Sequence, residues 1–341
     1  MENKLKLLLI GPLANEKDPS RTGGIIVLFE DLLSQCRKRN IDFLLIDTNK
    51  ANYPNIFLAL LLIYFKVFLL SFRVSHISLH GTAKDYIYIA PFVVFWSKLL
   101  RKQSSLRKFA GNFSEIYESS SSLKKKLLEF TLKNSYYNFF ETKYLVNYFS
   151  ALNQNTYWFP NVREKTVKIR EGAYQKKFIF IGSVTQEKGI KELLDASNLL
   201  DDSFVIDIYG NIAKDLQNCD FSMYKAEYKG ALRSENVLDT LCQYDVLILP
   251  SYREGYPGVI IEALSVGLPI IATKLQGISE MVDEKSSILI EPRNIEQLKE
   301  AIESINEYNY KSFSLNSLKA FEQFDSDVQT EIFFQNMGLK C

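Results

Sequence analysis

Short, almost continuously apolar runs alternate with stretches of helical periodicity along most of the chain. The apolar runs predict buried strands, which fall at residues 5–10, 42–46, 76–79, 178–181, 204–209, 245–249 and 269–273. The helical periodicity predicts helices between them, among which are residues 25–39, 190–200 and 295–307. Strands that are apolar on both faces and alternate with helices are typical of parallel sheets covered by helices on both sides. The pattern therefore predicts an α/β fold.

The alternation is interrupted by a polar stretch, residues 162–177, which follows Phe159-Pro160-Asn161, and it then restarts. A chain of 341 residues is long enough for two domains of roughly 150 residues each. We therefore expect two Rossmann-like domains that face each other across a cleft, the first of them comprising residues 1–165. Ligand sites in such domains lie at the carboxyl ends of the strands.

The charge is unevenly distributed between these two parts. Residues 1–165 carry 23 basic and 13 acidic side chains, a net charge of +10, whereas residues 166–341 carry 18 and 27, a net charge of −9. The total of +1 argues against a dedicated nucleic-acid-binding protein, so no nucleic-acid partner is expected. Only the first domain has a field suited to anionic surfaces.

The cysteines indicate a reducing compartment. Cys36, Cys219, Cys242 and Cys341 lie far apart, without C-x-x-C spacing or a neighbouring histidine cluster, which fits neither a zinc site nor a disulfide framework. The N-terminal residues run directly into a predicted strand and show no secretory cleavage site. We therefore expect a cytoplasmic protein.

Residues 56–72 are apolar at every position except Lys66 and Ser71. A membrane-spanning helix needs about 20 apolar residues, and Lys66 near the middle would cost ~3 kcal/mol. A true span is therefore disfavoured. A buried helix of an α/β domain and a helix lying partly in the membrane interface both remain open.

The most informative stretch is L-P-S-Y-R-E-G-Y-P-G-V-I-I-E-A-L-S-V-G-L-P-I-I-A-T, residues 249–273. Pro257 and Gly258 are suited to open a helix after the loop, and Gly267 followed by Pro269 is suited to end it. A helix that begins after a strand and a glycine-containing loop presents free N–H groups to an anion such as a diphosphate.

Glu254 lies before that helix and Glu262 lies within it. One carboxylate can therefore reach a ligand at the start of the helix, while the other reaches along its side. Because carboxylates accept hydrogen bonds from hydroxyl groups, a sugar and a ribose are suitable partners.

In this context the E-x7-E pair resembles the signature of retaining nucleotide-sugar glycosyltransferases of the GT-B fold, family 4 or "group 1". The resemblance covers nearly the whole chain in order, at Gly23-Gly24, His80-Gly81, Pro160-Asn161, Gly182, Lys188-Gly189, Tyr209-Gly210 and the glutamate motif. It implies the GT-B fold, with a nucleotide-sugar-binding domain at residues 166–315. It also implies that a C-terminal helical segment, residues 316–341, packs back on the N-terminal domain.

The resemblance also implies roles for individual residues. Glu254 is expected to bind hydroxyls of the transferred sugar, and Glu262 the ribose of the nucleotide. The backbone that is expected to bind the sugar and phosphates is that of Gly255, Tyr256, Pro257, Gly258 and Val259.

Further donor contacts are expected after two other strands of the second domain. Lys188 matches the lysine that supports the leaving phosphates, and Gly182, Tyr209 and Gly210 are expected to line the same site. Many relatives have an arginine where this sequence has Ser183, so phosphate binding rests on Lys188 with weaker help, or on a basic residue supplied elsewhere.

In the first domain, His80 resembles the histidine that lies beside the donor sugar, and we expect it to be catalytic together with Glu254 and Lys188. Gly24 is expected to let the backbone approach a phosphate or the acceptor closely. The basic pair Arg107 and Lys108 is expected to face the acceptor or a membrane.

The resemblance implies front-side displacement, in which the departing phosphate helps deprotonate the acceptor; no metal or other cofactor is expected. The basic N-terminal domain and the apolar segment favour a lipid-linked saccharide acceptor, as in bacterial surface polysaccharide assembly, and peripheral contact with the inner face of the cell membrane. A soluble acceptor, a GT-B-like nucleotide-sugar epimerase and a catalytically silent scaffold remain alternatives.

Two other motifs carry no such chemistry. Asp325-Ser326-Asp327 has the D-x-D form that binds metal-nucleotide in another glycosyltransferase fold, but its position before an apolar run favours helix capping. Ser251 lacks the G-x-S-x-G context of a hydrolase nucleophile.

Overall fold

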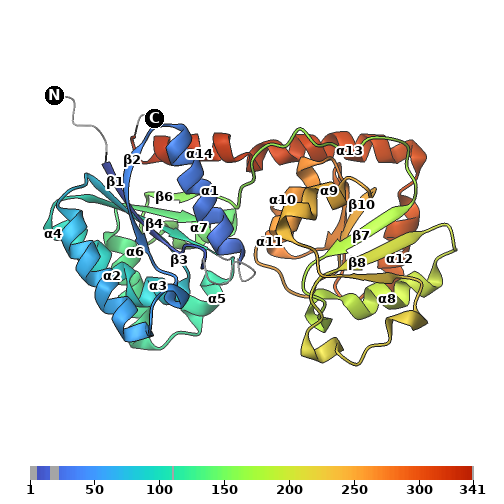
Figure 1. The fold of residues 1–341 in the computed structure, drawn as a ribbon, viewed down its shortest axis with the longest axis horizontal. Coiled ribbons are helices and arrows are strands. Elements are labelled where there is room, and N and C mark those ends of the chain that lie inside the picture. The colour runs from blue at the N-terminus through green and yellow to red at the C-terminus, as the bar shows by residue number, and fades with distance from the viewer. Residues whose placement is uncertain (1–5, 16–22, 110, 340–341) are drawn as a thin grey trace. The chain divides into compact units, whose positions relative to one another are not determined.

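The computed structural model describes residues 6–15, 23–109 and 111–339, and the chain divides into two compact units (Figure 1). Unit 1 consists of the chain up to Val162 together with Ser326 onward, and unit 2 is Arg163–Asp325. The boundary predicted from the sequence lies after residue 165, and the predicted C-terminal segment begins at residue 316. In the structure, the chain passes from unit 1 to unit 2 after Val162 and returns to unit 1 after Asp325.

Unit 1 contains a six-stranded parallel sheet in the order β2-β1-β3-β4-β5-β6. Its strands are β1 (Lys6–Gly11), β2 (Asp42–Asp47), β3 (His76–Gly81), β4 (Gln103–Lys108), β5 (Tyr137–Phe140) and β6 (Thr156–Trp158). Its helices are α1 (Gly24–Lys38), α2 (Ile56–Ser71), α3 (Ala83–Tyr88), α4 (Ala90–Leu99), α5 (Phe113–Glu118), α6 (Ser122–Asn134), α7 (Lys143–Ser150) and α14 (Ser326–Asn336).

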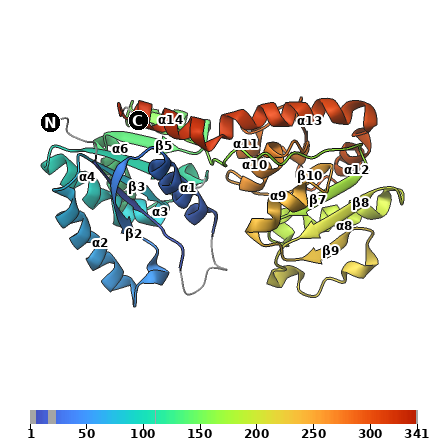
Figure 2. The same ribbon diagram turned by 45° about the horizontal axis from the view of Figure 1, so that its top comes forward.

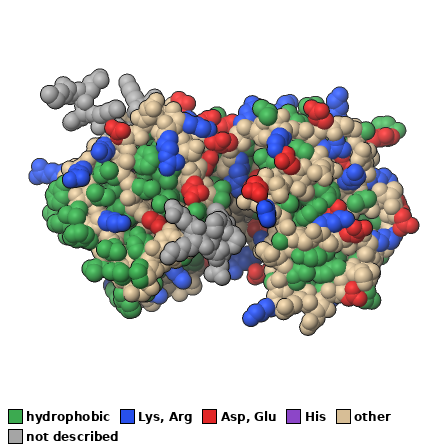
Figure 3. Space-filling view, in the orientation of Figure 1, with side chains coloured by type: hydrophobic (Ala, Val, Ile, Leu, Met, Phe, Trp, Pro, Cys, Tyr) green, Lys and Arg blue, Asp and Glu red, His purple; other side chains and the backbone are tan. Residues whose placement is uncertain are grey.

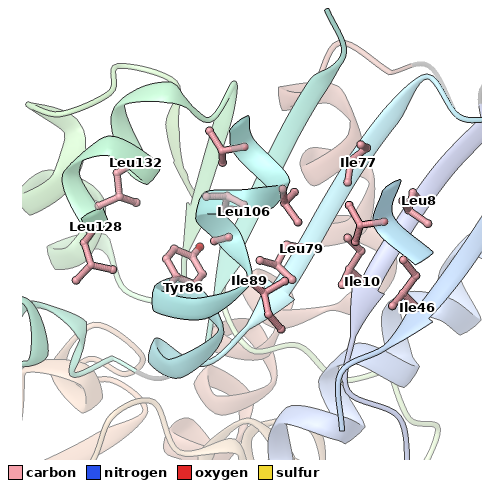
Figure 4. Packing of buried hydrophobic residues seen from close by; sticks show 14 of the residues in the cluster. Leu8, Ile10, Ile46, Ile77, Leu79, Tyr86, Ile89, Leu106, Leu128 and Leu132 are labelled. Carbon is pink, nitrogen blue, oxygen red and sulfur yellow. The ribbon is translucent and has the colours of Figure 1, made fainter. Parts of the chain in front are cut away.

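Both faces of this sheet are buried. Leu8 and Ile10 of β1 belong to one hydrophobic cluster, which Figure 4 shows with residues of β2, β3, β4, α3 and α6. Leu7 and Leu9, which point to the opposite face, belong to a second cluster with residues of α1 and α14. The predicted parallel sheet with both faces covered is confirmed.

The C-terminal helix α14 belongs to unit 1 and lies beside α1 (Figure 1, Figure 2). The ring of Phe333 lies 4.6 Å from the rings of Phe139 and of Phe159. Gln35 in α1 donates a hydrogen bond of 2.8 Å to the hydroxyl of Ser326, the first residue of α14. The returning segment is therefore shorter than expected, because the preceding helix remains in unit 2.

Unit 2 contains a second six-stranded parallel sheet in the order β12-β11-β10-β7-β8-β9. Its strands are β7 (Lys177–Ile181), β8 (Val205–Tyr209), β9 (Glu227–Gly230), β10 (Val246–Leu249), β11 (Ile270–Thr273) and β12 (Ser287–Ile290). Its helices are α8 (Ile190–Leu199), α9 (Val237–Leu241), α10 (Gly258–Ser265), α11 (Gln276–Ser279), α12 (Ile295–Ser304) and α13 (Glu307–Phe321). The chain builds β8 and β9 on one side of β7 and then crosses to build β10 on the other. The strand order therefore reverses between β7 and β10.

Strand β4, which hydrophobicity did not predict, has the sequence Q-S-S-L-R-K and is nevertheless buried from its second residue onward. Its polar atoms find partners inside the unit, since the Ser105 hydroxyl lies 2.7 Å from that of Ser78 and 3.0 Å from Nε2 of His76. A strand that satisfies its side chains by hydrogen bonding leaves no hydrophobic signal.

Asp245, directly before β10, holds the segment that leads into β7 against the start of β10. Its side chain is fully buried, and one carboxylate oxygen accepts a hydrogen bond of 2.7 Å from Nη2 of Arg170. The other oxygen accepts bonds from the backbone N–H groups of Gln175 and Lys177, at 2.8 and 2.9 Å. One carboxylate thus joins the incoming polar segment to two neighbouring strands.

Replacing Asp245 with alanine is therefore expected to lower the free energy of unfolding of unit 2 by about 3–5 kcal/mol, because the Arg170 guanidinium would be left buried without its carboxylate. The matched control is Asp239→Ala, which removes the exposed ion pair with Lys168 and should cost less than about 1 kcal/mol. Calorimetric unfolding measures both. Equal effects of the two substitutions would contradict the role assigned to Asp245.

Candidate functional site

The loops that follow β7 and β10 meet at the carboxyl edge of the unit 2 sheet, where the strand order reverses. Ligands of open parallel sheets bind at such switch points. The backbone N–H of Tyr252 donates to the carbonyl of Glu187 at 2.8 Å and joins the two loops. Gly189 has a φ of 69°, and a Cβ added there would lie 2.1 Å from the carbonyl oxygen of Pro250. This close approach requires glycine.

An ion pair joins the same two loops through side chains. Lys188 ends a single 3-10 turn, and its Nζ lies 2.5 Å from Oε1 of Glu254. The same oxygen accepts a hydrogen bond of 2.7 Å from the hydroxyl of Ser251, which is buried. The side chain of Glu254 is 9% exposed and that of Lys188 is 27% exposed, so the lysine is the more accessible partner. The structure therefore brings together two residues that the sequence analysis assigned to one site.

Helix α10 begins directly after this loop. It runs from Gly258 to Ser265 with Pro257 at its N-cap, and Gly267 has a φ of 83°. The predicted start and end of the helix are confirmed. Among the residues that the structure describes, no side chain caps the first turn and no acidic residue lies in it. Its amide groups are therefore positioned to receive an anion.

Glu262 lies in the middle of α10 and is paired with Arg163. Both Nε and Nη2 of Arg163 lie 2.8 Å from Oε1 of Glu262, and the two side chains are about one-fifth exposed. The sequence analysis did not identify Arg163. The only signal was its position, directly after Pro160-Asn161-Val162.

The other predicted donor-site residues of unit 2 lie on the loops and helix around this edge or next to it. Gly182 and Gly210 follow neighbouring strands and approach closely, because a Cβ on Gly210 would lie 1.6 Å from the carbonyl oxygen of Gly182. Ser183 is exposed. The hydroxyl of Tyr209 lies 3.2 Å from that of Tyr244, which donates to Asp207, so it belongs to a hydrogen-bond chain within the unit.

The residues between the two glutamates lie on the loop and on the start of α10. Tyr256 is buried, and its ring lies 6.1 Å from that of Phe324. The carbonyl oxygen of Gly255 lies 1.8 Å from where a Cβ on Gly277 would be. Gly258 and Val259 are the first two residues of α10 and are partly exposed.

In unit 1, Gly24 is the first residue of α1, and a Cβ added there would have open space around it. His80 is fully buried, with its ring 5.3 Å from that of Phe29 and 5.9 Å from that of Phe333. Its Nε2 lies 2.8 Å from the Ser78 hydroxyl, and burial lowers its pKa well below the usual value. His80 is therefore shielded from a ligand in this structure, which lends no support to its expected place beside the donor sugar.

Arg107 and Lys108 are also buried, so the prediction that they face an acceptor or a membrane is wrong for these side chains. The Arg107 guanidinium lies 3.8 Å from the ring centre of Phe159, and its Nη2 donates to the carbonyl of Pro160 at 2.8 Å. Burial lowers the pKa of Lys108 to about 8, and its Nζ donates to the carbonyl of Phe109. Both cations therefore make their contacts inside unit 1, at the end of β4.

No group of three or more His, Cys, Asp or Glu side chains within residues 6–15, 23–109 and 111–339 is arranged to hold a metal ion. Asp325 directly precedes α14, which begins at Ser326, as the capping interpretation of the D-x-D motif requires. None of the helices in the described ranges combines the length and hydrophobicity needed to cross a bilayer.

Comparison with known proteins bears on the fold and on the family resemblance. Residues 175–307 match the family described as "Glycosyl transferases group 1". Over 132 residues, the chain is 35% identical to the "Putative teichuronic acid biosynthesis glycosyltransferase TuaC" of Bacillus subtilis. That alignment covers 38% of this chain and 32% of TuaC, so the chain spans about a third of that relative's length.

Two solved structures resemble nearly the whole chain. HepE of Anabaena in complex with UDP has a TM-score of 0.76 at 13% identity, covering 98% of this chain and 100% of HepE. Sucrose-phosphate synthase of Thermosynechococcus elongatus has a TM-score of 0.73 at 14% identity, covering 98% of each chain. The predicted GT-B fold is confirmed.

The buried histidines of unit 1 predict a pH dependence of its stability. Burial lowers the pKa of His76 from 6.5 to about 4, so between these values the unfolded chain binds a proton that the folded chain does not. The free energy of unfolding of unit 1 therefore contains the full contribution of neutral His76 above pH 6.5. This contribution falls by about 3 kcal/mol as the pH drops to 4. Both tryptophans, Trp96 and Trp158, lie in unit 1, so tryptophan fluorescence during urea unfolding reports on this unit. The His76→Gln variant should show a shallower loss of stability over that range, and parallel curves for wild type and variant would contradict the assignment.

Proposed function

We propose that this chain transfers a sugar from a nucleotide-diphosphate sugar to a hydroxyl group of an acceptor, with retention of configuration at the anomeric carbon. The observation that carries the proposal is the arrangement at the β7–β10 switch point. There the glutamates of the E-x7-E motif are each paired with a cation beside the uncapped start of α10. The match of residues 175–307 to the group 1 family and the UDP bound by HepE support this choice of donor.

Each group has a physical task in this proposal. The amides at the start of α10 and the ammonium of Lys188 neutralise the diphosphate, and Lys188 exchanges Glu254 for a phosphate oxygen when the donor binds. Glu254 then accepts hydrogen bonds from sugar hydroxyls, and Glu262 from the ribose. The chain thus orients the donor and stabilises the charge that develops on the leaving group.

The reaction needs no covalent bond to the protein. The bond between the anomeric carbon and the diphosphate oxygen breaks, and the acceptor oxygen attacks that carbon from the same face. The acceptor proton passes to the departing phosphate, so the products are the glycosylated acceptor and a nucleoside diphosphate. Glu254 still accepts the hydrogen bond from the Ser251 hydroxyl after Lys188 has turned to the phosphate, which suits a binding group better than a nucleophile.

For the acceptor, we propose a lipid-linked saccharide of a bacterial surface polysaccharide, reached at the inner face of the cell membrane. The name of TuaC, which refers to teichuronic acid biosynthesis, supports a polysaccharide product. A cavity of about 680 Å³ at the carboxyl ends of β1 and β2 supports a saccharide in unit 1. It is lined by Asp47, Asn52 and Tyr53, whose polar and aromatic groups suit sugar recognition, and by Pro54, two residues before α2.

The outer face of α2 and α4 supports contact with lipid. The residues of α2 that point away from the core are large and apolar, and Phe57, Leu61 and Phe65 are 82%, 65% and 56% exposed. Phe95 and Leu99 of α4 are 55% and 60% exposed. Figure 3 shows apolar side chains gathered on the surface of unit 1 where α2 and α4 lie. Exposed apolar patches of this kind mark interaction sites.

The charge around this face suits an anionic bilayer. Between Asp47 and Glu115 the sequence contains nine basic residues, of which Arg107 and Lys108 are buried, and one acidic residue, Asp85. Asp85 is buried and paired with Lys50, whereas Lys66 and Arg73 are exposed on or beside α2. Each cation near an anionic membrane contributes about 1 kcal/mol to binding.

The donor site is tested with a panel of UDP-, GDP-, ADP- and dTDP-sugars. Wild type should gain thermal stability with one donor, and Glu262→Ala should weaken its binding about tenfold or more, because hydrogen bonds to charged groups contribute about 1.5–3 kcal/mol. Glu235→Ala, an exposed glutamate of the same unit, is the matched control and should bind as wild type does. A folded wild type that binds none of the panel would contradict the proposal.

The membrane contact is tested by sedimentation with vesicles of phosphatidylcholine containing phosphatidylglycerol. Wild type should bind, and the double substitution Phe57→Ser and Phe65→Ser should weaken binding at least about tenfold, since it removes two apolar side chains from the inserted face. Tyr308→Ser is the control, because Tyr308 is 89% exposed in unit 2. Absence of wild-type binding would favour a soluble acceptor.

A further inference from the structure

Arg163 occupies a fixed position at the start of unit 2. Its backbone N–H donates to the carbonyl of Phe324 at 3.0 Å, and it forms an isolated parallel bridge with Asp325, the last residue of the unit. Phe324 in turn contacts the ring of Tyr256, in the loop between the two glutamates. The backbone from which the Arg163 side chain extends is thus tied to the same unit as the candidate donor site.

The side chain of Arg163 lies on the first turns of α10. Its Nε and Nη2 both bond to Oε1 of Glu262 at 2.8 Å. A Cβ added to Gly258, the first residue of the helix, would lie 2.5 Å from Nη2, so the guanidinium occupies the space that a larger residue would fill. The planar fork of an arginine fixes the direction of a carboxylate more strictly than a lysine does.

Both bonds reach the same oxygen of Glu262. Oε2 makes no hydrogen bond or ion pair with the residues that the structure describes, and the Glu262 side chain is 20% exposed. The carboxylate is therefore held by one oxygen while the other is available to accept a hydrogen bond. A glutamate ordered in advance does not lose its conformational entropy when a ligand binds.

Stability alone explains this pair poorly. In a largely buried ion pair, the desolvation of both charges offsets much of their attraction, so such a pair is weak evidence for a stabilising role. A cation at the N-terminus of a helix also opposes the helix dipole, which favours anions there. The arginine is placed at an electrostatic cost, at the point where the proposed function puts the nucleotide.

We infer that Arg163 is a positioning residue for nucleotide recognition: it orients Glu262 so that Oε2 accepts a hydrogen bond from a ribose hydroxyl of the donor. The inference rests on the proposed function, because it assigns a role within the same donor site. In this arrangement, the preference for ribose over deoxyribose depends on Arg163, although Arg163 does not itself contact the ribose.

The test compares binding of UDP, GDP and ADP with that of their 2′-deoxy counterparts, by calorimetric titration of the full chain. For the nucleotide that wild type binds, the ribose form should bind about tenfold more tightly, since the site loses a charged hydrogen bond with the deoxy form. Arg163→Ala should weaken binding of the ribose form about tenfold and of the deoxy form less than about threefold, so that the preference nearly disappears. Glu262→Ala should have the same effect, and the double variant no more than either alone.

Arg163→Lys keeps the charge but not the fork, and it should restore only part of the preference for ribose. Thermal unfolding shows whether each variant folds. If Arg163→Ala does not fold, the comparison of ribose and deoxyribose forms is made with Arg163→Lys instead. Lys168→Ala, which removes an exposed cation of the same unit, is the matched control and should leave both affinities unchanged.

Two outcomes would overturn the inference. If Arg163→Ala weakened the ribose and deoxyribose forms equally, the arginine would contact the phosphates directly. If it changed neither, the pair with Glu262 would have no part in recognition. A wild type that bound no nucleotide would overturn the proposed function itself, and the inference with it.

Discussion

Each glutamate of the 254–262 motif is held by a cation that comes from a different segment of the chain. Lys188 reaches Glu254 from the loop after β7, and Arg163 reaches Glu262 from the first residue of unit 2. Without these pairs, two carboxylates would lie beside a helix start with no fixed direction. With them, the edge of the sheet presents ordered acceptors next to free amide donors, which is the arrangement that a diphosphate joined to two sugars requires.

The parallel topology brings these groups together. Because β7 and β10 are neighbouring parallel strands, the loops that follow them meet at one carboxyl edge and bring together residues far apart in the sequence. The backbone bond from Tyr252 to Glu187 and the close approach of Gly189 to Pro250 fix the two loops against each other. The sheet, buried on both faces, supplies a rigid base for them.

The sequence predicted the elements that hydrophobicity controls and the site residues that a local motif controls. The predicted apolar strands and the predicted start and end of α10 are present in the structure. Strands β5 and β12 are apolar but were not predicted. Lys188 and Glu254 were assigned to one site, but their contact was not predicted. Strand β4 was missed because its polar side chains are satisfied by partners distant in sequence. Arg107 was misplaced on the surface because charge normally indicates exposure, whereas here aromatic rings and a carbonyl enclose the guanidinium. Arg163 was missed because its partner lies 99 positions away in the sequence, and no local pattern records such a pair.

The most direct test of the proposed donor site is a crystal structure of the chain with the nucleoside diphosphate that it binds. We expect the diphosphate at the start of α10 with Lys188 on a phosphate oxygen, and the ribose hydroxyls within hydrogen-bond distance of Glu262. We also expect that Arg163 still holds the opposite oxygen of that carboxylate. A nucleotide bound elsewhere in the chain, or one whose ribose faces away from Glu262, would contradict the proposed donor site.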